Sequence, residues 1–218
     1  MKFQTLIFDL DGTLAETRHD IAAATNHTRR HFDLQPLNVE TIRSYIGDGI
    51  TKLLQRALPP IPESQMEEAY SVFTDYYSQH LADTTKLYPG ILEFLKDFSH
   101  LKIAVLSNKA QLFTDKIVDA LDIRRFFAIV LGSKDDVPKK PAADAIEIII
   151  SKLNIEKESV LMIGDSKNDI LAGQAAGIKT CAVSWGFRPE SELKNYNPDI
   201  IIHTIEELKK YVETKDLL

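Results

Sequence analysis

The chain has 218 residues, of which 44% are hydrophobic and 27% charged, a composition typical of a folded globular protein rather than a disordered one. Its formal net charge of -6 argues against a broad basic surface for nucleic acid or anionic lipid, so we expect neither partner. The sequence also contains no apolar run of the roughly 18 to 20 residues that a membrane-spanning helix needs.

The cysteine content and the start of the chain bear on the compartment. A single cysteine, Cys181, cannot form an internal disulfide, which suits a reducing cytosol. We expect it to be a small buried hydrophobe within "TCAV". The apolar start of the chain soon meets Asp9 instead of continuing as an export signal. We therefore expect a cytoplasmic protein, as a monomer or a homodimer.

Short apolar runs alternate with helical patterns along most of the chain, which is typical of a parallel sheet covered by helices. Continuous apolar runs fit strands that are buried on both faces. The predicted strands are 5–8, 103–106, 128–131, 160–163, 180–183 and 199–202. The predicted helices between them are 91–98, 112–121, 141–153, 168–176 and 205–212. Pro141 would occupy a first helical turn, where proline is tolerated. The sequence thus predicts an α/β fold with a Rossmann-like parallel sheet core.

The region after the first strand interrupts this alternation. From Leu14 to Leu87 the pattern is amphipathic and helical, with no convincing strand. Helices are expected at 17–32, 39–45, 50–58 and 64–81, with the prolines of "LPPIP" as a break. We therefore predict an inserted all-helical cap domain, residues 15–87, and a catalytic core formed by residues 1–14 and 88–218.

Polar side chains follow the predicted strands, where open α/β sheets bind their ligands. The set comprises Asp9, Asp11, Ser107, Asn108, Lys109, Lys139, Lys140, Asp165, Ser166 and Asp169. Several carboxylates at one edge repel each other unless a cation lies between them, and oxygen ligands suit Mg²⁺. Since Mg²⁺ keeps waters and accepts phosphate oxygens, and lysine also suits phosphate, this edge resembles a phosphoryl-transfer centre.

Four short motifs resemble those of the haloacid dehalogenase superfamily in their order and spacing. They are "DLDGT" (9–13), "LSN" (106–108), "KKP" (139–141) and "GDSKND" (164–169). The segments "IRSYIGDGITKLLQRAL" (42–58), "YPGILEFL" (88–95) and "VSWGF" (183–187) are more particularly similar to phosphoglycolate phosphatase-like members. The resemblance covers nearly the whole chain. It implies a Mg²⁺-dependent phosphomonoester hydrolase that acts on 2-phosphoglycolate or a similar small phosphorylated metabolite.

Chemistry and this resemblance together assign roles within the first motif. Asp9 is the expected nucleophile, because an aspartyl-phosphate splits one difficult displacement into two easier ones. Its second oxygen would bind Mg²⁺. Asp11 would protonate the leaving alcohol, later deprotonate the attacking water, and offer its main-chain carbonyl to the metal. A halide needs no proton, so the presence of this acid favours phosphate esters. Gly12 and Thr13 would shape the turn beside the bound phosphate.

The later motifs supply the remaining ligands. Asp165 is expected to complete the protein ligands of Mg²⁺, while Asp169 braces the site without contacting the metal. Ser107 and the backbone N–H of Asn108 would donate hydrogen bonds to phosphate oxygens. Lys140 would face the charge that develops in the transition state.

The cap segment carries a candidate substrate loop, "IGDG". Its glycines, Gly47 and Gly49, either end a helix or let the backbone approach a ligand, and the resemblance favours the second interpretation. Arg43 and Lys52 flank this loop as candidate partners of a substrate carboxylate, or as solvated charges.

Four further residues leave two interpretations open. His27 and His31 stand four apart on an expected helix and could share a metal, yet the sequence offers no equally placed third ligand. We expect them to form a polar face of the cap. Trp185 and Arg188 either border the active site or serve packing and surface charge.

Other functions share the same core motifs. A relative could hydrolyse pyrophosphate or a sugar or nucleotide monophosphate, because fold and catalytic motifs do not determine the leaving group. A phosphomutase would retain Asp9 and Asp11 and return the phosphoryl group to a sugar. A noncatalytic phosphate sensor would need neither nucleophile nor acid, so the complete set argues against it.

Overall fold

The computed structural model describes residues 3–214, and its centre is a six-stranded parallel sheet with the strand order β5-β4-β1-β6-β7-β8. The strands are β1 (Thr5–Phe8), β4 (Lys102–Ala110), β5 (Ile129–Ser133), β6 (Val160–Gly164), β7 (Lys179–Val183) and β8 (Ile200–Ile202). In register, Phe8 of β1 lies opposite Val105 of β4 and Ile163 of β6. The six predicted strands are thus confirmed, and the residues that follow β1 lie at the middle of the sheet edge.

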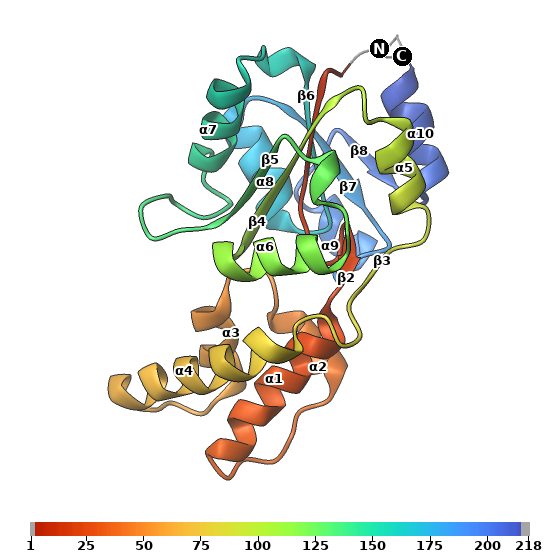
Figure 1. Cartoon of the computed structure of the whole chain (residues 1–218). Helices are drawn as coiled ribbons and strands as arrows, with labels where there is room; N and C mark the ends of the chain where they lie inside the picture. The colour runs from red at the N-terminus through yellow and green to blue at the C-terminus, as the bar shows by residue number, and fades with distance from the viewer. Residues whose placement is uncertain (1–2, 215–218) are drawn as a thin grey trace.

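Helices cover both faces of this sheet (Figure 1). One face carries α5 (Ile91–Asp97), α6 (Gln111–Ala120) and α10 (Ile205–Glu213), and the other carries α7 (Asp144–Leu153) and α8 (Lys167–Ala176). Short elements complete this part of the chain: η1 (Arg124–Phe126), η2 (Lys157–Ser159) and α9 (Glu190–Lys194). Among residues 3–214, no helix combines the length and the apolar character that a membrane span requires.

The central strand shows why its sequence is apolar from Leu6 to Phe8. All four residues of β1 are fully buried. Leu6 and Phe8 pack into the core cluster that contains Phe94 of α5, whereas Ile7 points to the opposite face and joins the cluster of Ile146 on α7. Phe8 and Phe94 meet edge to face with ring centroids 5.7 Å apart. Because alternate side chains of β1 enter two different cores, both faces of this strand must be hydrophobic.

A separate group of helices lies beside the carboxyl edge of the sheet, at the bottom of Figure 1. It comprises α1 (Arg18–His31), α2 (Val39–Tyr45), α3 (Ile50–Ala57) and α4 (Glu63–His80), with α1 packed against α4. These four helices begin and end within two residues of the predicted positions. We call residues 15–87 the cap segment, and its status as a domain distinct from residues 1–14 and 88–218 stays a prediction.

Two details of the sequence interpretation were wrong. The region from Leu14 to Leu87 does contain strand structure, because β2 (Ala15–Glu16) and β3 (Lys86–Leu87) pair antiparallel at its two ends. Strands of two residues show no periodicity that a sequence window could detect. Helix α7 begins at Asp144 rather than at Pro141. Lys140, which precedes Pro141, is held in place at both ends: its Nζ donates to the carbonyl of Leu106, and its own carbonyl accepts from Asn108 Nδ2. The chain therefore turns before the helix begins.

Candidate active site

A cavity lies between the carboxyl edge of the sheet and the cap segment, with about 680 Å³ of space that includes some open solvent. The predicted residues that line it are Asp9, Asp11, Gly47, Gly49, Ser107, Asn108, Lys140 and Asp165. Thr13 and Asp169 are buried directly behind this lining, where the Thr13 hydroxyl lies 3.5 Å from Asp165 Oδ1. The fold therefore brings residues from four distant motifs to one place.

Lys140 forms the centre of the buried polar network. Its Nζ donates hydrogen bonds to Asp9 Oδ1 at 2.8 Å, to Asp169 Oδ1 at 2.6 Å and to the carbonyl of Leu106 at 2.7 Å. Burial lowers the pKa of Lys140, but the carboxylates of Asp169 and Asp9 outweigh burial and raise the pKa above its ordinary value. The ammonium is therefore charged at neutral pH and fixed beside the proposed nucleophile.

Asp169 uses both of its oxygens inside the protein. Oδ1 accepts the bond from Lys140, and Oδ2 accepts from the backbone N–H of Ser166 at 3.0 Å and from its hydroxyl at 2.7 Å. These contacts form a capping box at the start of α8. A carboxylate with this many partners is suited to holding Lys140, which supports a bracing role for Asp169.

Three buried carboxylates could hold a metal ion: ligand atoms of Asp9, Asp165 and Asp169 lie within 4.8 Å of one another. Burial raises the pKa of Asp9 to about 7, and burial together with the neighbouring charge of Asp9 raises the pKa of Asp165 well above its ordinary value. Carboxylates in such a site gain from a nearby cation, which favours their charged forms. The donor set, all oxygen, fits Mg²⁺.

Gly12 is required by the close approach of Asp165. Its backbone has φ +87°, and a Cβ at this position would lie 2.3 Å from Asp165 Oδ2. The same Oδ2 accepts a hydrogen bond from the backbone N–H of Phe187 at 2.5 Å. Any side chain at position 12 would therefore displace the Asp165 carboxylate from the cavity.

Asp11 faces a different set of partners. Its Oδ1 accepts a hydrogen bond from Thr17 Oγ1 at 2.6 Å, and its Oδ2 lies 3.4 Å from Lys109 Nζ. Lys109 in turn donates to the hydroxyl of Tyr77 on α4 at 2.8 Å. Asp11 thus stands between the sheet edge and the cap segment.

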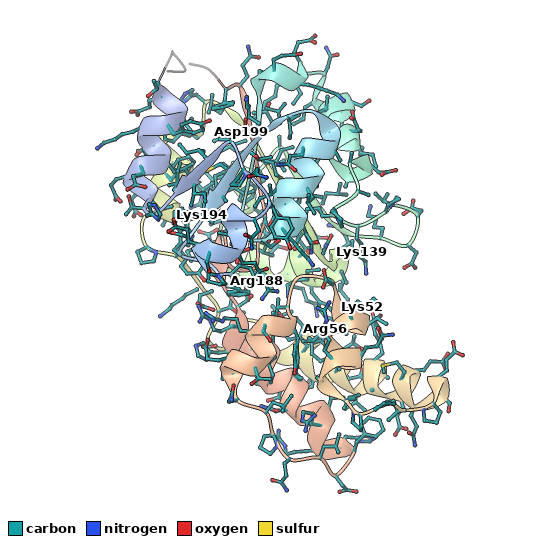
Figure 2. All side chains as sticks on the ribbon, turned by 180° about the vertical axis from the view of Figure 1, so that it is seen from behind. Lys52, Arg56, Lys139, Arg188, Lys194 and Asp199 are labelled. Carbon is teal, nitrogen blue, oxygen red and sulfur yellow. The ribbon has the colours of Figure 1, made fainter. Side chains whose placement is uncertain are left out.

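The "IGDG" loop is docked against the core. Asn108 Nδ2 donates to the carbonyl of Gly47 at 2.9 Å, and Asn168 Nδ2 donates to Asp48 Oδ1 at 2.8 Å. The Arg188 guanidinium donates to the carbonyls of Arg43 and Ile46 at the end of α2. Figure 2 shows Arg188 at the lower end of the core, directed toward the cap segment. The loop consequently forms one wall of the cavity.

The structure separates the remaining candidates of the cap segment. Arg43 pairs with Glu40 at 2.9 Å, Lys52 is exposed, and neither side chain lines the cavity. The His27 ring stacks on Tyr76, and His31 Nε2 contacts Glu68 Oε1 at 2.7 Å. Within residues 3–214 the group suited to a metal consists of aspartates alone, so these histidines form no such site.

Several residues that line the cavity went unassigned in the sequence, among them Tyr77, Asn168 and Phe187. Asn168 stands inside the "GDSKND" motif, next to Asp169, so its position in the motif could have predicted that it lies at the site. Arg188, which had two interpretations, does line the cavity. Trp185 borders the site, because its indole N–H donates to the carbonyl of Thr13 at 3.1 Å.

Comparison with known proteins agrees with this geometry. Residues 6–183 match the family model described as haloacid dehalogenase-like hydrolase. Among curated relatives, the phosphoglycolate phosphatase of Chromobacterium violaceum is 34% identical over 212 residues, which cover 94% of each chain. That of Aquifex aeolicus is 33% identical over 213 residues, covering 96% of this chain and 97% of the relative.

Solved structures share the same fold. The crystal structure of a predicted phosphoglycolate phosphatase from Haemophilus somnus superimposes with a TM-score of 0.92 and is 26% identical, over 98% of this chain and 99% of that one. The agreement covers the sheet, the covering helices and the cap segment alike, because almost nothing of either chain is left out. The chain therefore belongs to the haloacid dehalogenase-like hydrolase family, and within it to the enzymes that act as phosphatases.

Proposed function

We propose that this phosphatase hydrolyses small phosphomonoesters, with 2-phosphoglycolate as the leading candidate, through an aspartyl-phosphate formed on Asp9. The observation that carries the proposal is the position of Asp9, whose carboxylate lies in the cavity while Oδ1 is held by Lys140 at 2.8 Å. The names of the curated relatives support the choice of substrate. The single buried cysteine supports a cytoplasmic location.

The proposed metal site uses residues already present at the sheet edge. Asp9, Asp165 and the main-chain carbonyl of Asp11 would hold Mg²⁺, with Asp169 behind them. When bound, this ion supplies positive charge that neutralises and orients the phosphoryl oxygens.

The chemistry then falls to side chains of the chain itself. Asp9 attacks the phosphorus atom, so that a bond forms to its carboxylate oxygen while the bond to the leaving oxygen breaks. Asp11 donates its proton to that oxygen and afterwards takes a proton from the water that hydrolyses the aspartyl-phosphate. Lys140 stabilises the charge on the phosphoryl oxygens throughout. The products are inorganic phosphate and the alcohol.

The end of β4 supports a phosphate-binding role for Ser107 and Asn108. The register of β4 with β5 shifts between Leu106 and Ala110, so this stretch leaves the regular ladder. The side-chain amide of Asn108 donates to the carbonyls of Gly47 and Lys140, so it is engaged inside the protein, and the main-chain N–H is the group that we assign to phosphate. The Ser107 hydroxyl lies beside it on the cavity wall.

The test measures phosphate release from a panel of metabolites, with Mg²⁺ or with excess chelator. We expect 2-phosphoglycolate to have a high kcat/KM with Mg²⁺ and no turnover in chelator. The Asp9→Asn variant should lose activity by at least about a thousandfold while its circular dichroism spectrum is unchanged. A folded variant that stays near wild-type activity would refute the nucleophile.

The same panel separates the alternatives. Faster phosphate release from pyrophosphate, or from a sugar or nucleotide monophosphate, than from 2-phosphoglycolate would show that the proposed substrate is wrong. The proposed mechanism on Asp9 would still stand. An isomerised phosphosugar in place of free phosphate would identify a mutase. Binding without turnover would identify a sensor.

A further inference from the structure

Lys109 is a buried cation that the proposed mechanism does not use. Its side chain is 7% exposed and lines the cavity near the end of β4. Its Nζ lies 3.4 Å from Asp11 Oδ2, donates to the Tyr77 hydroxyl at 2.8 Å, and lies 4.7 Å from the centroid of the Tyr77 ring. Lys109 therefore connects the proposed general acid to the wall that α4 contributes.

The other cations that line this cavity are already engaged. They are Lys140 and Arg188. Lys140 uses its three N–H groups on Asp9, Asp169 and the Leu106 carbonyl. Arg188 donates to two carbonyls of the cap segment, and it holds the loop in place. Lys109 has three donors as well, of which one goes to Tyr77 and one faces Asp11 at a long distance. Among the three lining cations, Lys109 is the one that lies beside Asp11, so it is the one placed to meet a group on the leaving alcohol.

The surroundings strengthen the field of this ammonium. Asp11 Oδ2 at 3.4 Å and the Tyr77 hydroxyl at 2.8 Å both offer oxygen atoms to the ammonium, contacts that favour its charged form. The neighbouring wall of the cavity is apolar and includes Ile50, Leu53 and Phe73. A cation against such a wall is weakly screened, so it interacts strongly with an anion that enters.

We propose that Lys109 binds an anionic group on the leaving alcohol and so selects phosphate esters that carry a carboxylate close to the ester oxygen. The inference rests on the proposed function, which places the phosphoryl group at Asp9 and the leaving oxygen at Asp11. Lys109 is the next group along this line, toward the cap segment. Tyr77 acts as a positioning residue, because its hydroxyl holds the ammonium at the cavity wall.

Selectivity follows from charge. An uncharged alcohol adds no anionic partner for the third N–H group of the ammonium, and a cationic alcohol meets repulsion. A carboxylate one carbon away from the ester oxygen, as in 2-phosphoglycolate, gains a charge-assisted hydrogen bond from Lys109. Asp11 keeps its contact with Thr17 and with the leaving oxygen.

The experiment compares 2-phosphoglycolate with ethyl phosphate, which lacks the carboxylate. For Lys109→Met we expect the ratio of their kcat/KM values to fall by about 10- to 100-fold, the size of a hydrogen bond to a charged group. Lys109→Arg should keep most of the ratio, because it keeps the charge. The matched control is Lys52→Met, which removes an exposed lysine outside the cavity and should leave the ratio unchanged.

A binding measurement provides a readout independent of turnover. Calorimetry on Asp9→Asn should show tighter binding of 2-phosphoglycolate than of ethyl phosphate. In Asp9→Asn/Lys109→Met this difference in Kd should fall by the same factor as the ratio of kcat/KM values. Lys109→Gln serves in place of the methionine variant if circular dichroism shows that the latter is unfolded.

The outcomes distinguish this inference from the proposed function. An equal loss on both esters, or no loss, overturns the role of Lys109 while the wild-type activity on 2-phosphoglycolate still stands. If the wild type instead prefers another carboxylate-bearing ester, the proposed substrate fails, and a preference abolished by Lys109→Met still supports the inference. A wild type that favours ethyl phosphate or phosphoethanolamine overturns both.

Discussion

Asp169 serves two structures at once, since one oxygen caps α8 and the other holds Lys140. The two functions are linked, because the capping bonds from Ser166 fix the carboxylate that in turn orients the ammonium. The beginning of a helix thereby sets the position of a charge in the site. The motif "GDSKND" therefore contains one residue that both caps a helix and orients a charge in the site. Both functions require Asp169 at a fixed distance from Ser166, so the spacing of the motif predicted the site.

Asp199 gives the clearest pH-dependent contribution to stability outside the site. Its Oδ2 accepts from the backbone N–H of Thr180 at 2.9 Å and from the Thr180 hydroxyl at 3.0 Å, while Oδ1 pairs with Lys179. Partial burial raises the pKa of Asp199, but these hydrogen bonds outweigh it and hold the pKa below its ordinary value. The carboxylate of Asp199 therefore binds a proton less tightly in the folded state than in the unfolded state.

We expect Asp199→Asn to lower the free energy of unfolding at pH 7 by about 0.5 to 1.5 kcal/mol. A depressed folded pKa stabilises the fold above the unfolded pKa of about 3.9, and that contribution disappears as the pH falls through the folded value. Urea titrations at pH 7 and at pH 3 should show the difference from wild type shrinking in acid. A difference that stays constant across this range would contradict the assignment.

The contacts that sequence reasoning missed are tertiary ones. The hydrogen bond from Lys109 to Tyr77 joins the end of a strand to a helix residue 32 positions earlier, and no local sequence pattern predicts it. The engagement of Arg188 with the end of α2 spans a still larger separation. By contrast, Asp9 and Asp165 each follow a buried strand directly, and Asp11 comes two residues after Asp9, so the strand pattern itself located them.

At the level of elements, long periodic segments were predictable and very short ones were not. The run "TLIF" matched β1 residue for residue, because burial on both faces favours consecutive apolar side chains such as Leu6, Ile7 and Phe8. The two-residue strands β2 and β3 exist through pairing across the cap segment, with Ala15 opposite Leu87. Their formation depends on how the helices between them fold, which a local window cannot include.

The start of α3 depends on Gly49. This residue caps the helix with φ +87° and ψ 171°, a backbone region that is essentially restricted to glycine. An added Cβ would also lie 2.9 Å from Lys139 Nζ, although that flexible end can move. At Gly47, with φ +123°, the nearest atoms to a Cβ are 3.7 Å away, so conformation rather than collision is the constraint.

We expect Gly49→Ala to reduce kcat/KM for the best metabolite by about 5- to 100-fold, since about 1 to 3 kcal/mol of backbone strain opposes the docked loop. The matched control is Gly177→Ala, which also has a positive φ but no atom within 4 Å of the added Cβ. Steady-state kinetics and thermal melts should show lower stability in both variants and reduced kcat/KM in the first alone. Equal kinetics in the two variants would exclude the loop as a substrate wall.

Across the whole molecule, the cap segment and the sheet share one hydrophobic core cluster, which includes Phe73 of α4, Phe113 of α6 and Phe8 of β1. Polar contacts from Asn108, Asn168 and Arg188 add to this apolar contact. Both kinds of interaction therefore hold the cap segment against the sheet. We expect this docking to restrict water near a bound substrate and to assemble the substrate site from both sides.

Arg188→Met should weaken this closure, because it removes the donors that hold the end of α2. Each hydrogen bond contributes about 0.5 to 1.5 kcal/mol, so we expect amide exchange in residues 46–49 to accelerate by about 2- to 10-fold. Lys194→Met is the control, since Lys194 makes an exposed ion pair with Glu190 within α9. Exchange that is unchanged in Arg188→Met would show that the apolar contacts alone hold the cap segment closed.

The pairing of β2 with β3 has a consequence for how this protein can be rebuilt. Glu16 and Lys86 lie opposite each other, so the chain leaves and re-enters the core at adjacent points. Paired residues of antiparallel strands have Cα atoms about 4.5 to 5.5 Å apart, a gap that a two-residue turn spans. A short turn or a foreign insert between Glu16 and Lys86 would accordingly leave the core backbone in place, provided that it covers apolar side chains such as Phe113, which now packs on Tyr77. The paired residues Glu16 and Lys86 are thus a suitable site at which to exchange the cap segment for another one while keeping the same sheet.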